Sequence, residues 1–196
     1  MKGILFIISG PSGVGKGTVI RSLKAKYANF VFPISQTTRA MRPGEKEGDV
    51  YNFRSDSDFD AEMQKGNFLE TAQVHQKARY GTLKKPIIDA LEAGKVVVRE
   101  VDVQGFHSIA AVVPRQNLVS IFLKAESPAK LLERIAKRGL LPDEELKRRM
   151  ESAEHEMAAA GEFDFEVWSL EGGVDKLVAD VDEIILGAVA KAGLKI

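Results

Sequence analysis

The sequence has no cysteine and no surplus of charge of either sign. Without cysteine, disulfides, thiolate metal sites and cysteine nucleophiles are all excluded. Lysine plus arginine and aspartate plus glutamate both number 28, so the net charge is zero. Proteins that bind nucleic acid favour a basic surplus, and we therefore expect no nucleic-acid partner.

Long apolar runs are also missing. No apolar stretch has the length that crosses a bilayer, and the N-terminus has neither the basic start nor the cleavage pattern of a secretory signal. We therefore expect a cytoplasmic protein without membrane contact. The 196 residues suffice for one hydrophobic core, and no repeat or linker divides them. A single domain, acting as a monomer or homodimer, is the expected organisation.

A glycine-rich stretch near the N-terminus organises the chain. It follows the apolar run 4–8, which predicts a buried strand, and precedes residues 19–27, whose apolar positions have helical spacing. Glycines let backbone N–H groups turn inward around an anion, and a helix N-terminus adds a positive dipole end. This order predicts a loop that binds the phosphates of a nucleoside triphosphate, rather than a chance turn. The loop residues are Gly10, Pro11, Ser12, Gly13, Val14, Gly15, Lys16, Gly17 and Thr18.

In this loop Lys16 supplies the mobile charge for the outer phosphates. Most such loops carry Ser or Thr directly after the lysine, where the hydroxyl faces Mg²⁺. Here Gly17 takes that position and Thr18 follows, as in some nucleoside monophosphate kinases, so Thr18 is the candidate for the metal-side hydroxyl. Asp102 and Glu100 alternate at the end of a later strand near the loop, and one of them is expected to order the Mg²⁺ shell through water.

The rest of the chain alternates predicted strands and helices, with one exception. Strands are expected at 30–35, 95–101, 118–123 and 165–168, and helices at 86–94, 104–113, 127–138, from 142 onward and at 174–188. This alternation predicts an α/β protein with a parallel, doubly wound sheet, in which ligands bind beyond the carboxyl ends of the strands. The phosphate loop, Ser35 and Asp102 are expected at such ends. Residues 36–85 differ, because glycines punctuate short apolar pieces around a helix at 57–65, which indicates a small strand-rich insertion.

Several motifs, in order along essentially the whole chain, resemble those of guanylate kinases. The segment Thr37–Glu45, followed by Gly48, Tyr51 and Phe53, is similar to that family's GMP-binding signature. Later blocks of the family resemble Phe68-Leu69-Glu70, Tyr80-Gly81-Thr82, Glu100–Gly105, Arg134, Arg138-Gly139, Arg149 and Ala153. The resemblance implies an enzyme of purine nucleotide metabolism that converts ATP and GMP to ADP and GDP with Mg²⁺.

The resemblance also implies an architecture. It is a P-loop NTPase-type parallel sheet flanked by helices, with a small strand-rich GMP-binding insertion and a helical lid. By this reading the core comprises 1–35, 86–125 and 160–196, the GMP-binding subdomain 36–85 and the lid about 126–159.

The phosphate of GMP requires positive charge and hydrogen-bond donors. Arg39 and Arg42 lie in a loop bounded by Gly and Pro, and guanidinium forks bind phosphate bidentately. Tyr51 and Tyr80 could add phenolic donors. By composition alone the arginines could be solvated loop charges, whereas the resemblance implies binding and identifies Tyr51 as a ligand.

Guanine presents N1–H and N2–H₂ donors and an O6 acceptor on one edge. A carboxylate accepts from both donors, and Glu70 matches this role, with Asp102 assisting. The hydroxyls of Ser35 and Thr82 match the donors to O6. Adenine reverses the pattern, so a carboxylate in this place disfavours AMP.

Phosphoryl transfer needs positioning and charge neutralisation more than a base. The attacking phosphate of GMP is already an anion, so we expect no general base. Lys16 and Mg²⁺ hold the phosphates of ATP. Arg134 and Arg138, at i and i+4 on one helix face, are expected to clamp the transferring group with Arg149 when the lid closes. The alternative is a solvated, salt-bridged helix face.

Other positions depart from the family pattern. Between Glu70 and Tyr80 the chain is one residue longer than usual, and Arg79 stands where the family often has a tyrosine. Ser169 replaces an asparagine that helps to hold adenine in the family, which leaves open the contact to the ATP base and the choice between ATP and GTP.

Two rival functions remain. Another small P-loop kinase, for example one acting on a ribose phosphate, would keep Lys16 but lack the joint set Glu70, Ser35, Arg39 and Arg42. A non-catalytic guanylate-kinase-like module that binds phosphopeptides typically loses the phosphate loop and belongs to a longer multidomain chain.

Overall fold

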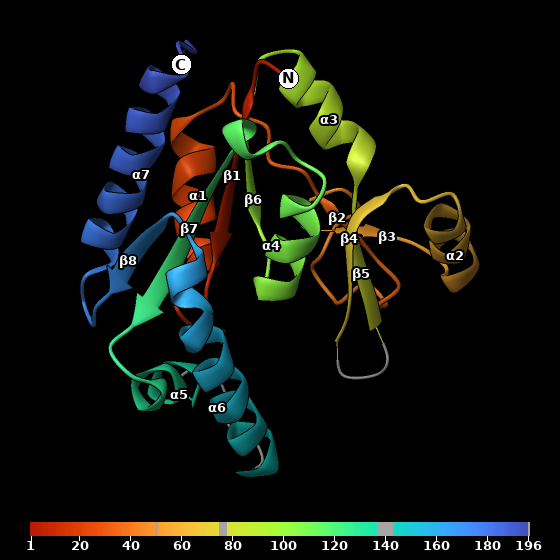
Figure 1. Cartoon of the computed structure of the whole chain (residues 1–196). Coiled ribbons are helices and arrows are strands. Elements are labelled where there is room, and N and C mark those ends of the chain that lie inside the picture. Colours follow the sequence, from red (N-terminus) through yellow and green to blue (C-terminus); the bar gives the residue numbers. More distant parts are fainter. Residues whose placement is uncertain (50, 75–77, 137–142, 196) are drawn as a thin grey trace.

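The computed structural model describes residues 1–49, 51–74, 78–136 and 143–195. Within these residues the strands form two four-stranded sheets. The core sheet contains β1 (Ile4–Ser9), β6 (Val96–Glu100), β7 (Leu118–Ala125) and β8 (Phe165–Ser169). These strands run parallel in the order β6-β1-β7-β8 (Figure 1). The α/β fold with a parallel sheet, predicted from the sequence, is therefore confirmed.

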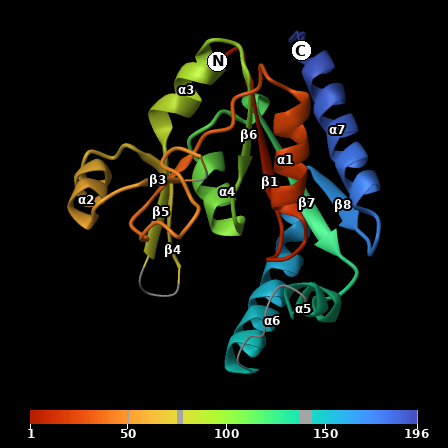
Figure 2. The same ribbon diagram turned by 180° about the vertical axis from the view of Figure 1, so that it is seen from behind.

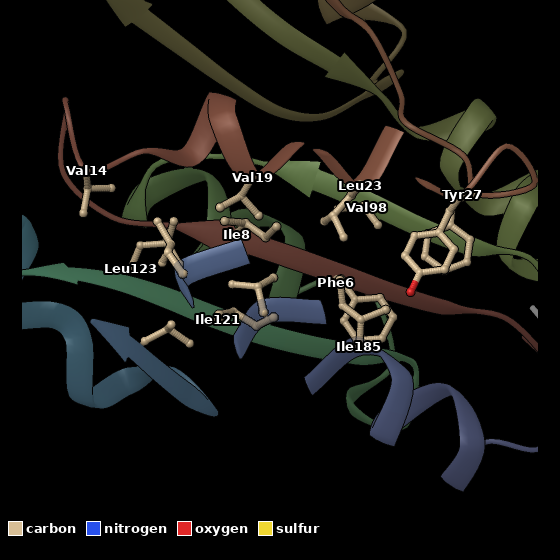
Figure 3. Close-up of a cluster of buried hydrophobic side chains, with 14 of the residues drawn as sticks. Phe6, Ile8, Val14, Val19, Leu23, Tyr27, Val98, Ile121, Leu123 and Ile185 are labelled. Carbon is tan, nitrogen blue, oxygen red and sulfur yellow. The ribbon is translucent and has the colours of Figure 1, made fainter. Parts of the chain in front are cut away.

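Helices cover both faces of the core sheet, because β1 is apolar and buried on both sides. Helices α1 (Lys16–Lys26) and α7 (Val174–Lys191) pack on one face, and α3 (Lys84–Glu92) and α4 (Val103–Ala110) on the other. Phe6 and Ile8 join the cluster under α1 and α7, and Figure 3 shows Phe6 beside Ile185 of α7. Leu5 and Ile7 point the other way, into the cluster under α3 and α4.

The second sheet holds β2 (Ser35–Thr37), β3 (Tyr51–Phe53), β4 (Phe68–Val74) and β5 (Ala78–Leu83). Its order is β3-β2-β5-β4, with β2 and β3 parallel and the other pairs antiparallel. Helix α2 (Asp56–Gln64) begins after Ser55, whose hydroxyl accepts the N–H of Asp58 at 3.1 Å. This sheet is the strand-rich insertion predicted from the sequence, and Figure 1 shows it to one side of the core.

The predicted strand at 30–35 is wrong. Within the described residues, Val31 alone of this segment pairs with the core sheet, through a bridge to Val97 at its β6 edge. Pro33 has no N–H to continue such a ladder, and the chain then leaves the core. Ser35 is the first residue of β2 in the second sheet and does not lie at the carboxyl end of a core strand.

Helices α5 (Pro128–Ala136) and α6 (Asp143–Ala158) pack against each other beyond the carboxyl ends of the core strands (Figures 1 and 2). Short 3₁₀ turns at Arg115–Asn117 and Ala159–Glu162 precede β7 and β8. Leu131 of α5 and Ala153 of α6 are buried in the cluster under α1 and α7, which attaches the pair to the core. Among the described residues, no helix is both long enough and apolar enough to cross a membrane.

Strand β8 forms one edge of the core sheet and carries the chain's only tryptophan. Trp168 is 50% exposed, and Lys124 of β7 places its Nζ 4.8 Å from the ring centroid. The same ammonium pairs with Glu166 at 2.8 Å. The outward residues of β8 are thus tied to β7 by a cation–π contact and an ion pair.

Gly81 of β5 is required by the close approach of two aromatic rings. A Cβ there would lie 2.7 and 2.8 Å from ring carbons of Phe68 and 3.1 Å from Phe59. The two rings stack at 4.5 Å between centroids, so neither can withdraw easily. We expect Gly81→Ala to lower the free energy of unfolding by about 1–3 kcal/mol through overpacking, as measured by urea denaturation.

The matched control is Gly187→Ala on α7. Apart from its chain neighbours and the backbone of its own helix, no described atom lies within 4 Å of a Cβ built there, and the same change in a helix removes backbone entropy from the unfolded chain. It should leave stability unchanged or slightly higher. Equal effects of the two substitutions would contradict the packing argument.

Candidate active site

The phosphate loop joins the end of β1 to the start of α1. Gly10, Gly13 and Gly15 have φ values of 136, 86 and 111°, which disfavour residues with a side chain. A Cβ at Gly10 would also lie 2.4 Å from the carbonyl oxygen of Leu123, so the loop lies directly against β7. The loop backbone and the N-terminus of α1 together provide an anion-binding cradle.

Lys16 is the first residue of α1 and is half-buried. Its Nζ donates to the carbonyl oxygens of Gly10 at 2.5 Å and Pro11 at 3.2 Å, across the loop. A cleft of about 280 Å³ beside it is lined by Lys16, Thr18, Arg21 and Glu100, among others. The predicted lysine therefore lies in an open, polar cleft.

Oxygen ligands suitable for Mg²⁺ are present in this cleft. Thr18 Oγ1 accepts from Arg21 Nη2 at 3.0 Å, and the carboxylate of Glu100 lines the same space. Asp102 is placed differently. Its Oδ1 accepts the N–H of Gly105 at 2.7 Å as the N-cap of α4. Of the two carboxylates predicted near the metal, Glu100 is the one that lines the phosphate-loop cleft.

Helix α6 brings a further carboxyl group to this region, which sequence reasoning missed. Glu156 lines a second cleft with Asp102. Burial raises the pKa of Glu156, while the nearby positive charge of Lys16 opposes the shift. Arg149, one of the predicted clamp residues, is half-buried seven residues earlier on α6, a spacing that places it on the same helix face.

The predicted clamp includes two other residues. Arg138 lies outside the described residues, and Arg134 is located on α5 without a described side chain. The clamp stays a prediction.

One end of the second sheet collects the residues predicted for the phosphate of GMP. Arg39 forms a bidentate ion pair with Glu45, at 3.0 and 2.9 Å. Its guanidinium lies 5.5 Å from the ring centroid of Tyr51, whose ring meets that of Tyr80 edge to face at 5.4 Å. Arg42 is exposed in the loop, and its backbone N–H donates to Glu45 at 2.8 Å. The structure thus brings together Arg39, Tyr51 and Tyr80, with Arg42 at the rim.

Tyr51 is suited to donate a hydrogen bond. Burial, followed by the neighbouring Tyr80 and Glu100, raises the pKa of the Tyr51 phenol above its usual value. The hydroxyl keeps its proton at neutral pH and can give it to a phosphate oxygen.

Glu70 and Thr82 are direct cross-strand partners on β4 and β5. A register shift between Phe68 and Glu70 interrupts the ladder and re-aims the strand at this point. Thr82 Oγ1 donates to Glu70 Oε1 at 2.5 Å, so in this structure the threonine proton is engaged with the carboxylate. The Oγ of Ser35 accepts a hydrogen bond from Nη2 of Arg99 on β6.

Arg99 is a second residue that sequence reasoning missed. It follows the apolar run Val96-Val97-Val98 and faces the cleft that Ser35 and Tyr51 also line. The signal for it in the sequence was a charged residue directly after the apolar residues of a predicted buried strand. Its partners lie on segments distant in sequence, and no local pattern reveals them.

Two departures from the expected pattern have structural explanations. Arg79 pairs with Asp56 at 2.7 Å and with Asp60, and its guanidinium lies 4.8 Å from the ring centroid of Phe59, so it ties β5 to α2. Ser169 is buried at the end of β8, with its Oγ 3.9 Å from a Cβ built on Gly15. It therefore lies close to the phosphate loop.

Comparison with known proteins decides the family. A family model described as guanylate kinase matches residues 2–188. The chain belongs to the guanylate kinase family. It is 43% identical over 83% of its length to a guanylate kinase of Nocardia farcinica, of which 84% is covered. With a guanylate kinase of Corynebacterium diphtheriae it shares 38% identity over 94% of this chain and 95% of the relative.

A solved structure agrees with the guanylate kinase assignment. The crystal structure of guanylate kinase from Anaplasma phagocytophilum superposes with a TM-score of 0.74 at 26% identity, covering 94% of this chain and 85% of that one. Membership of the guanylate kinase family confirms the resemblance found in the sequence.

Proposed function

We propose that this chain transfers the γ-phosphate of ATP to GMP, giving ADP and GDP. The observation that carries the proposal is the contact between two clefts. Gly17, Arg21 and Glu100 line both the phosphate-loop cleft and the cleft of about 580 Å³ that contains Ser35 and Tyr51. This second cleft is not the one that Glu156 and Asp102 line. A nucleoside triphosphate in the first cleft and a monophosphate in the second would meet at these shared residues.

Each group has a defined task in the transfer. The loop backbone and Lys16 bind the ATP phosphates, while Arg39, Arg42, Tyr51 and Tyr80 bind the phosphate of GMP. An anionic oxygen of that phosphate forms a bond to the γ-phosphorus as the bond to the leaving oxygen of ADP breaks, with the electron pair staying on ADP. Positioning and charge neutralisation supply the catalysis, and no base is needed.

The guanine edge is read by Glu70 and Ser35, while the hydroxyl of Thr82 donates to the Glu70 carboxylate. The carboxylate accepts from N1–H and N2–H₂, and a hydroxyl donates to O6. Asp102 assists Glu70 in this role. Glu70 is buried on β4, opposite Thr82 of β5, so its carboxylate is held in place by the sheet.

Mg²⁺ is the expected cofactor. The hydroxyl of Thr18 and the carboxylate of Glu100 are hard oxygen ligands in the phosphate-loop cleft, and they fit this ion, directly or through water. Bound with ATP, the ion supplies neutralisation of phosphate charge.

The division into core, GMP-binding subdomain and lid completes the proposal. Residues 36–85 close over GMP, and 126–159 close over ATP and deliver Arg134, Arg138 and Arg149 to the transferring group. The separate second sheet and the helix pair α5 and α6 support this division. A cytoplasmic location and a monomeric or dimeric assembly stay predictions from the sequence.

A coupled assay of ADP release tests the function. GMP, dGMP, AMP, UMP and CMP are compared as acceptors with ATP as donor. To compare ATP and GTP as donors to GMP, total nucleoside diphosphate is measured, because GTP leaves GDP instead of ADP. We expect ADP release with GMP far above that with AMP or the pyrimidine nucleotides. No release with GMP, or equal rates with all acceptors, would overturn the proposal.

The role of Thr18 gives a separate prediction. Thr18→Val removes the hydroxyl while keeping the shape of the side chain, so we expect a higher Mg²⁺ requirement and a lower rate. Titration of Mg²⁺ at saturating ATP and GMP measures both. Thr18→Ser is the matched control, since it keeps the hydroxyl and should restore the Mg²⁺ dependence. An unchanged titration in Thr18→Val would exclude this hydroxyl as a ligand.

A further inference from the structure

Arg99 is a charged residue on β6 that directly follows three buried valines, Val96–Val98. Its side chain is 13% exposed. Nη1 donates to the carbonyl oxygen of Pro33 at 3.1 Å, and Nη2 donates to Ser35 Oγ. The same Nη2 lies 3.7 Å from Oε1 of Glu70. One guanidinium from β6 therefore contacts both of the residues proposed to read opposite ends of the guanine edge.

Burial of this cation is costly, which argues against a role in packing alone. Burial lowers the pKa of Arg99, while Glu70, Glu100 and Tyr51 oppose the shift. Its Nε is buried and has no hydrogen-bond partner among the described residues. An apolar side chain of similar size would fill this space without the desolvation penalty of a guanidinium. Arg99 also lines the cleft that contains Ser35 and Tyr51.

The contacts of Arg99 dictate the direction of the hydrogen bonds around it. Because Nη2 donates to Ser35 Oγ, the proton of the Ser35 hydroxyl remains available for an acceptor. Thr82 and Arg99 both approach Oε1 of Glu70, which compensates its buried negative charge and leaves Oε2 for donors of a ligand. A ligand edge that offers donors to Glu70 and an acceptor to Ser35 is that of guanine.

We infer that Arg99 is a specificity-determining positioning residue, which aligns the Glu70 carboxylate and the Ser35 hydroxyl for guanine. This inference rests on the proposed function. It predicts that loss of the guanidinium weakens discrimination between GMP and IMP, because IMP lacks the N2 amino group that Glu70 must meet. Binding of ATP in the phosphate-loop cleft should be unaffected.

The test compares Arg99→Met with Arg79→Met. Both remove an arginine that contacts carboxylates, but Arg79 ties β5 to α2 and contacts none of the proposed guanine-reading residues. The measurements are kcat and KM for GMP and IMP, and KM for ATP. For Arg99→Met we expect the ratio of kcat/KM for GMP over IMP to fall about tenfold, with KM for ATP unchanged. Arg79→Met should keep the wild-type ratio.

A second pair of variants separates positioning from a general structural role. In the Glu70→Gln background, adding Arg99→Met should change the ratio of GMP to IMP little, since Arg99 acts through Glu70. Arg99→Gln, which keeps amide donors without the charge, provides a second neutral substitution if Arg99→Met fails to fold. An unchanged ratio in the variants that fold overturns the inference. Absence of GMP-dependent ADP release in the wild type would instead overturn the proposed function.

Discussion

Lys16→Ala is expected to reduce ADP release by roughly 10²- to 10³-fold or more, with little change in the free energy of unfolding. The ammonium crosses the loop to two carbonyl oxygens and lies beside the phosphate-loop cleft, where we propose that it stabilises charge on the transferring phosphate. Its half-buried side chain contributes little packing to the core. Steady-state rates at saturating ATP and GMP, together with urea denaturation, measure both quantities.

Lys26→Ala is the matched control for Lys16→Ala. It removes a lysine from the last turn of the same helix, where the ammonium pairs with Asp182 at 2.7 Å, remote from the loop. We expect normal turnover and only a small change in stability, because the Lys26 end of this ion pair is exposed and screened by solvent. A near wild-type rate in Lys16→Ala would contradict the assignment of the phosphate loop.

Glu70→Gln is expected to lower kcat/KM for GMP by about tenfold to a thousandfold. The substitution keeps the shape of the side chain but replaces an acceptor oxygen with an NH₂ donor. That donor faces either a donor of guanine or the hydroxyl of Thr82, which donates to Glu70 in the structure. Hydrogen bonds to charged groups contribute roughly 1.5–3 kcal/mol, and an unsatisfied buried donor adds a similar penalty. About 1.4 kcal/mol corresponds to each tenfold loss.

Comparing GMP with AMP as the substrate tests this second prediction most directly. Activity with AMP should fall much less than activity with GMP, because adenine N1 is an acceptor and makes poor use of a carboxylate. Glu62→Gln on α2 is the control, since Glu62 is a half-buried partner of Asn67 and Lys65 in the same subdomain. Equal losses with GMP and AMP in Glu70→Gln would show a structural role, and guanine reading would then pass to Asp102 or Ser35.

Sequence patterns were enough to predict those elements whose residues are contiguous in the chain. The apolar run of β1, the glycines after it and the helical spacing of α1 are contiguous, so the sequence alone predicted the phosphate loop and the parallel sheet around it. The insertion was visible as a change in the spacing of glycines. Ser35 was misplaced because an apolar segment that includes Pro33 resembles a strand whether or not it finds a pairing partner.

Contacts between distant segments could not be predicted. Arg99 and Ser35 meet across 64 positions, and Thr82 is paired with Glu70 only through the register of β4 and β5. The choice between Glu100 and Asp102 depends on where β6 ends and α4 begins, a boundary that residue types alone do not determine. The residue types of the candidate site could thus be predicted from the sequence, whereas the contacts between these residues could not.

Trp168 has a practical consequence for any unfolding study of this protein. As the only tryptophan, it emits from the edge of the core sheet, while the second sheet contains Tyr51 and Tyr80 but no tryptophan within residues 35–85. Tryptophan emission therefore follows the core alone, and separate melting of the insertion would be spectroscopically silent at that wavelength. Circular dichroism sees both sheets. Coincident transitions by the two methods would show that core and insertion unfold as one cooperative unit.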